Sequence, residues 1–64
     1  MNSILEQLYK ESEHIGNFVF PAISRQAEEA RERGDIEGLK DAIRKQWEAN
    51  NRMDELNRMM EASS

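Results

Sequence analysis

Apolar residues recur at helical spacing through two long stretches of the chain, one on each side of Arg33-Gly34-Asp35. In the first stretch they are four or seven residues apart, on one face of a helix: Ile4, Leu8, Ile15 and Val19. Glycine just after one helix and aspartate at the start of the next are residues that a tight reversal favours. We therefore predict an all-α antiparallel helical hairpin, one domain over 1–64, with helices at about 3–33 and 36–62 and a turn at 33–35.

The second stretch fits a period of 3.5 residues, which predicts a left-handed supercoil against the first helix. One predicted seam position holds Ile36, Ile43, Asn50 and Asn57, the other Leu39, Gln46, Met53 and Met60, and Ala42, Ala49 and Leu56 flank them. Folding the chain at Gly34 brings Ala22 or Ile23 opposite Trp47. We therefore expect Trp47 to fill the core of the hairpin.

The first helical pattern is interrupted at Gly16-Asn17, and Pro21 follows. Inside a regular helix the Pro21 ring would clash with the carbonyl of Asn17. One interpretation is a break or sharp kink near 16–21, with Asn17 capping a new helix that carries Pro21 in its first turn. The other is a single, gently bent helix, and the sequence leaves both open.

The size of the chain predicts self-association. A chain of 64 residues buries only about 60% of its unfolded surface, and without cysteine it has no disulfide to stabilise it. We therefore expect a homodimer that forms a four-helix bundle, with the orientation of the two chains left open. The net charge of −4 disfavours nucleic acid, and no apolar run approaches the roughly 20 residues of a membrane span. We expect a cytoplasmic protein.

Aromatic residues suggest where a partner binds. Phe18-Val19-Phe20 is apolar on every side of a helix, so a second chain or another protein must cover Phe18 or Phe20. Asn50 in an apolar seam is a residue that fixes the register of a dimer or contacts a partner. The candidate residues for a dimer or partner interface are Ile15, Phe18, Phe20, Trp47, Asn50 and Met53.

The sequence offers little catalytic chemistry. Glu11 and His14 have the Glu-x-x-His spacing of di-iron helical bundles, but the opposing seam offers amides in place of a carboxylate. We expect Glu11 to pair with Arg58 or Asn57 across the hairpin, and we expect no metal and no other cofactor. The sequence lacks a glycine-rich phosphate loop and a Ser/His/Asp set, so we predict no enzyme.

Three resemblances to known families are architectural or short. Gly34-Asp35-Ile36-Glu37 resembles the turn between the helices of a tetratricopeptide repeat. In length and layout the chain is similar to the Rop family of plasmid proteins, dimeric hairpins that form four-helix bundles. The opening residues, Ser3 to Tyr9, resemble small proteins of Firmicutes and their phages.

These patterns favour a small non-enzymatic regulator or adaptor, encoded by a phage or mobile element, that docks a helical surface on another protein. One alternative is a Rop-like dimer that binds RNA through the local basic cluster of Lys40, Arg44 and Lys45. The other is a structural assembly protein.

Overall fold

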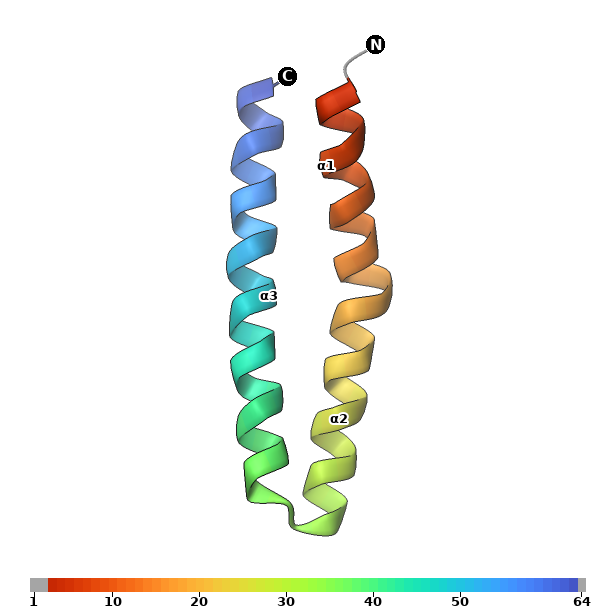
Figure 1. Cartoon of the computed structure of the whole chain (residues 1–64), viewed down its shortest axis with the longest axis vertical. Coiled ribbons are helices and arrows are strands. Elements are labelled where there is room, and N and C mark those ends of the chain that lie inside the picture. The colour runs from red at the N-terminus through yellow and green to blue at the C-terminus, as the bar shows by residue number, and fades with distance from the viewer. Residues whose placement is uncertain (1–2, 64) are drawn as a thin grey trace.

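The chain forms two helical columns that lie antiparallel and side by side (Figure 1) in a computed structural model that describes residues 3–63. The first column contains α1 (Ser3–His14), a π-helical segment η1 (Ile15–Val19) and α2 (Phe20–Arg33), and the second is α3 (Ile36–Ser63). The beginning of α1 and the end of α3 lie at one end of the molecule, the open end, and the connecting turn lies at the other (Figure 1). The predicted all-α hairpin is confirmed, as a rod that measures 49 × 16 × 10 Å.

The turn has the hydrogen bonds of a Schellman motif followed by a helix N-cap. Gly34, at φ 68°, donates its N–H to the carbonyl of Arg31 (3.2 Å), and Asp35 donates to the carbonyl of Ala30 (2.8 Å). Oδ1 of Asp35 then accepts the N–H of Gly38 at 2.9 Å. A Cβ at Gly38 would lie 2.5 Å from Oδ2 of Asp35. The reversal therefore requires glycine at Gly34 for its left-handed backbone, and glycine at Gly38 leaves room for the Asp35 carboxylate in this position.

The core is a narrow seam in which small residues contribute much of the contact. Its buried residues are Leu8, Ile15, Ile23 and Ala30 from the first column and Ala42, Ala49 and Leu56 from α3. The seam predicted through Ile36, Ile43, Asn50 and Asn57 is wrong, because Ile36 and Ile43 are 67% and 59% exposed and the two asparagines are exposed as well. The other predicted seam position, Leu39, Gln46, Met53 and Met60, is half-buried, and Met53 and Met60 pack against the core. The contact face is therefore displaced toward Ala42, Ala49 and Leu56, each one residue before a position of the wrongly predicted row, because alanines let the two backbones approach closely.

Trp47 does not fill the core. Its side chain is 68% exposed, whereas Ala42 and Ala49, on the side of α3 that faces the first column, are 1% and 8% exposed. An indole ring between the columns would hold them further apart than two methyl groups do. The predicted core position of Trp47 is therefore wrong, and the ring lies on the flank of the hairpin.

The interruption in the first column is a wide helical turn. The N–H of Phe20 donates to the carbonyl of Ile15, five residues back. Buried positions in this column are seven residues apart on each side of the turn, but Ile15 and Ile23 are eight apart. The turn therefore accommodates one extra residue and keeps both apolar faces in the seam. The wide turn lies immediately before Pro21. Its displaced carbonyl groups leave room for the proline ring, which in a regular α-helix would clash with the carbonyl four residues back. The expected break with Asn17 as a cap is replaced by a π-helical turn in a continuous column.

Candidate interaction surfaces

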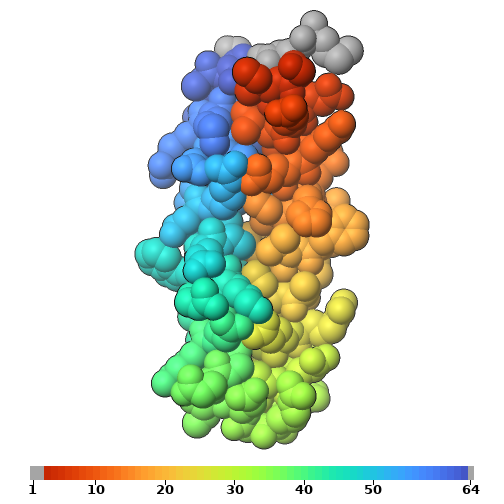
Figure 2. Space-filling model, in the orientation of Figure 1, coloured from red at the N-terminus to blue at the C-terminus, as the bar shows by residue number. Residues whose placement is uncertain are grey.

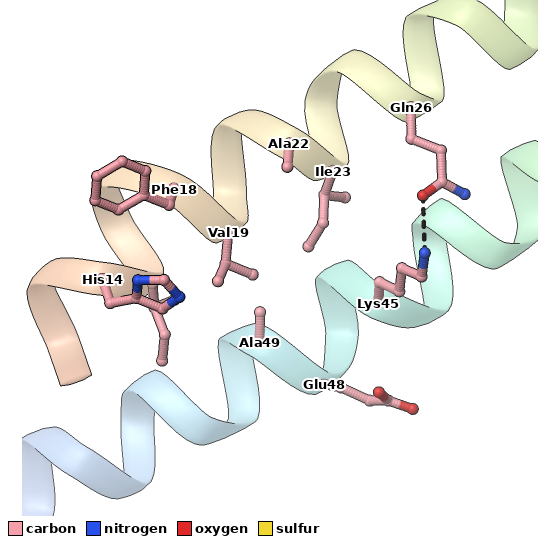
Figure 3. A pocket seen from close by; sticks show the side chains of 10 residues that line it. His14, Phe18, Val19, Ala22, Ile23, Gln26, Lys45, Glu48 and Ala49 are labelled. Carbon is pink, nitrogen blue, oxygen red and sulfur yellow. Dashed lines mark hydrogen bonds between the residues drawn. The ribbon is translucent and has the colours of Figure 1, made fainter.

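One uncovered surface surrounds Phe18, at the level of η1 (Figure 3). Phe18 is 65% exposed and its ring lies 5.4 Å from that of His14. The two rings border an open groove of about 540 Å³ between the columns, with Ala22 further along on one side and Lys45 and Glu48 on the other. We call these five residues the phenylalanine groove. It combines an accessible aromatic side chain with charged groups at its rim.

The candidate residues near Phe18 have different environments. Phe20 is half-buried and packs against the core, so the hairpin itself covers one of the two phenylalanines. Ile15 is 6% exposed and belongs to the core, which removes it as a surface candidate. Met53 is half-buried, and its sulfur accepts a hydrogen bond from the hydroxyl of Ser12 at 3.5 Å. Phe18 is therefore the accessible member of this group.

A second uncovered surface surrounds Trp47. A depression of about 240 Å³ lies beside the indole, with Ile23 and Ala42 in its lining. Its other lining residues are Ser24 and Ala27 from α2 and Ile43, Gln46 and Trp47 from α3, and we call these five the tryptophan face. The sequence analysis assigned Trp47 to the core and missed this face. The heptad spacing of Ala42, Ala49 and Leu56 was the signal that could have revealed it.

Gln26 and Asp41 link the two columns near the turn. The amide nitrogen of Gln26 donates to Oδ2 of Asp41 and to the carbonyl of Gly38, both at 3.1 Å. Lys45 donates to the amide oxygen of Gln26 at 3.0 Å (Figure 3). Hydrogen bonds from Gln26, Arg44 and Lys45 hold the pKa of Asp41 well below its usual range. This network fixes the rim of the phenylalanine groove.

The basic cluster proposed as a nucleic-acid site is balanced by carboxylates. Nζ of Lys40 lies 3.9 Å from Glu37, and Nζ of Lys45 lies 3.1 Å from Asp41. Arg44 pairs with Asp41 as well. A phosphate would have to compete with these acids for each of the three cations.

Glu11 and Arg52 form a bidentate ion pair between α1 and α3. Nε of Arg52 lies 2.5 Å from one carboxylate oxygen of Glu11, and Nη2 lies 2.9 Å from the other. Arg58 or Asn57 was the expected partner, and that expectation is wrong. Among residues 3–63, no three His, Cys, Asp or Glu side chains come together as a metal site.

Comparison with protein families matches residues 2–64 to the N-terminal domain of transcription elongation factors of the GreA and GreB type. The chain belongs to the GreA/GreB N-terminal family. The match covers both columns and the turn, and the helical hairpin fits this family. Comparison with curated proteins and with solved structures gives no significant match. Within residues 3–63, none of the helices has the length and apolarity that crossing a bilayer requires.

The Glu11–Arg52 pair predicts how this GreA/GreB hairpin responds to acid. Hydrogen bonding from Arg52 lowers the pKa of Glu11 from its usual 4.5. A carboxylate with a lowered folded-state pKa stabilises the fold above its unfolded pKa, and this contribution is lost as pH falls. Arg52→Gln should therefore make the melting temperature fall less than that of the wild type between about pH 6 and about pH 3.

Thermal melting followed by circular dichroism measures this difference. Arg25→Gln, on the exposed part of α2, is the matched control and should follow the wild-type pH profile. Parallel profiles for all three proteins would mean that the Glu11–Arg52 pair contributes nothing to the pH dependence.

Proposed function

We propose that this chain is a non-enzymatic regulator of transcription that docks its helical hairpin on RNA polymerase. The observation that carries the proposal is the family match, which extends over residues 2–64 and names a transcription elongation factor domain. RNA polymerase is the protein on which elongation factors of this family act. The rod shape supports the proposal, because a hairpin 49 Å long offers long helical faces to a larger protein.

The phenylalanine groove is the surface that we assign to this docking. Aromatic side chains are enriched in protein interfaces and often contribute most of the binding free energy. Phe18 is accessible without any change in the fold, and His14 beside it extends the aromatic surface. Lys45 and Glu48 at the rim are paired within the hairpin with Asp41 and Arg44, and as exposed side chains they present groups of both signs to a partner.

The mechanism in this proposal is occupancy of a surface on the polymerase, without bond chemistry by the hairpin. A cytoplasmic location, together with the polymerase, is part of the proposal. Direct binding of RNA through Lys40, Arg44 and Lys45 is the weaker alternative, because Glu37 and Asp41 balance these cations.

A binding experiment with fluorescently labelled hairpin tests the proposal. The chain has no cysteine, so Ser63→Cys provides a single labelling site near the open end. Fluorescence anisotropy should rise when purified RNA polymerase is added. Phe18→Ala should raise the Kd at least about tenfold, the effect of removing an aromatic hot spot.

Tyr9→Ala is the matched control, since Tyr9 is an aromatic residue of α1 that is 55% exposed. It should bind like the wild type. No binding by the wild type would overturn the proposed function. Equal affinities for the wild type and Phe18→Ala would overturn the assigned surface and leave the polymerase as the partner.

Self-association into a four-helix bundle is a second part of the proposal. The accessible surface of the chain is 4986 Å², whereas a compact monomer of its 7.5 kDa mass would expose about 4,200 Å². A rod exposes more surface than a globule of the same mass, and the exposed surface of this one includes large apolar side chains, among them Ile36, Ile43 and Trp47. Pairing two hairpins would cover such side chains.

A further inference from the structure

The tryptophan face combines a projection with a depression. The indole of Trp47 is 68% exposed and Ile43, one turn earlier on α3, is 59% exposed. The depression beside them is lined on the α2 side by small residues, Ser24 and Ala27. A protruding ring and an adjoining hollow on one surface are what a self-complementary, two-fold interface requires, because each copy supplies both halves of the contact.

Charged residues at equal distances on both sides of Trp47 indicate the orientation of such a pair. Lys40 precedes Trp47 by seven residues and Asp54 follows it by seven, so each lies about 20° from Trp47 around α3, on opposite sides of it, and all three share one face of the helix. The two charges are therefore each about 10 Å from Trp47 along the helix. The Lys40 side chain is 70% exposed, although its Nζ lies 3.9 Å from a carboxylate oxygen of Glu37, so Asp54 of a second copy would share Lys40 with Glu37. Asp54 is exposed too.

An antiparallel pair with its two-fold axis near Trp47 would bring Lys40 of one copy opposite Asp54 of the other, twice. A parallel pair would instead place lysine opposite lysine and aspartate opposite aspartate, an arrangement that like charges oppose. The charge pattern thus selects a second copy of the chain in antiparallel orientation as the occupant of this face. A docking surface for an unrelated protein has no need of this symmetry.

We propose that two copies of this chain pair through their tryptophan faces, with the two α3 helices antiparallel and Trp47 of each copy seated in the depression of the other. The inference rests on the self-association included in the proposed function, and it names the surface and the orientation. It does not use the phenylalanine groove, which stays open on each copy for the polymerase.

The test measures molar mass by light scattering behind a sizing column, across a dilution series. The wild type should show twice 7.5 kDa and dissociate only at high dilution. Trp47 is the single tryptophan, so its emission should shift to the blue as the dimer forms. Trp47→Ala should raise the dimer Kd at least about tenfold, and Phe18→Ala, at the other groove, should leave it unchanged.

A charge exchange tests the orientation. Lys40→Asp alone should weaken the dimer, because it places two acids opposite each other, and Lys40→Asp combined with Asp54→Lys should restore it. Both substitutions leave the buried seam intact, and circular dichroism would confirm that the variants fold.

Each alternative result overturns the inference in a distinct way. A wild type that is monomeric at every concentration would remove the self-association itself. A dimer that survives Trp47→Ala would pair through another surface, and one that the double exchange fails to restore would have another orientation. A monomer in which Trp47→Ala, but not Phe18→Ala, abolishes polymerase binding would assign the tryptophan face to the polymerase.

Discussion

Leu56→Ala should lower the free energy of unfolding by about 2–5 kcal/mol, the range for truncating a fully buried leucine. The Leu56 side chain is 0% exposed, and it is the one large side chain of residues 3–63 that is completely buried. It belongs to the core cluster together with Leu8 of α1, so it holds the open end of the hairpin closed. Small domains have little stability to spare, so the variant should be largely unfolded near room temperature.

Urea unfolding followed by far-ultraviolet circular dichroism measures this loss. The matched control is Ile36→Ala, which removes an aliphatic side chain that is 67% exposed at the turn end of α3. It should change the free energy of unfolding by less than about 1 kcal/mol. Equal losses for the two variants would show that burial in the seam does not govern stability.

Deleting Gly16 in a Pro21→Ala background should leave the hairpin at least as stable as Pro21→Ala alone. The deletion removes the extra residue between Ile15 and Ile23, so that η1 can become regular α-helix with the seam in register. Nothing lies within 4 Å of where a Cβ of Gly16 would be, so the deletion sacrifices no side-chain contact. It also removes a helical glycine, which costs about 1 kcal/mol relative to alanine.

The control is deletion of Arg25 in the same background. Arg25 lies in regular α-helix between Ile23 and Ala30, so its loss leaves these two buried residues six apart and rotates Ile23 by about 100° out of the seam, whatever η1 does. That variant should lose more than about 3 kcal/mol of stability. Thermal melting distinguishes the two deletions, and equal damage from both would mean that the wide turn does not accommodate an extra residue.

The sequence was sufficient to predict the hairpin because its decisive signals are local. Gly34 and Asp35 satisfy the backbone groups of the turn with their own conformation and side chain. Which side of α3 faces the first column depends instead on contacts between the two columns, namely on which residues are small enough to let them approach each other. The prediction relied on the largest apolar residues, Ile36 and Ile43, whereas the close contacts come from Ala42 and Ala49.

The same distinction explains what could be predicted of the candidate surfaces. An uncovered phenylalanine could be predicted, as either Phe18 or Phe20, because three consecutive apolar residues cannot all face one helical seam. The exposure of Trp47 could not be predicted, because it depends on which side of α3 faces the first column. The wide turn was visible only as a disturbance near Gly16 and Pro21, since its geometry depends on the seam spacing on both sides of it.

Because α1 begins and α3 ends at the open end, the response of the hairpin to mechanical force depends on where the force is applied (Figure 1). Tension applied between the two ends pulls the columns apart sideways and loads one pair of contacts at a time. Leu8 and Leu56 would separate first and the Gly34 turn last. The molecule should therefore unzip at low force, whereas force applied along the rod between the turn and the open end would load the whole seam together.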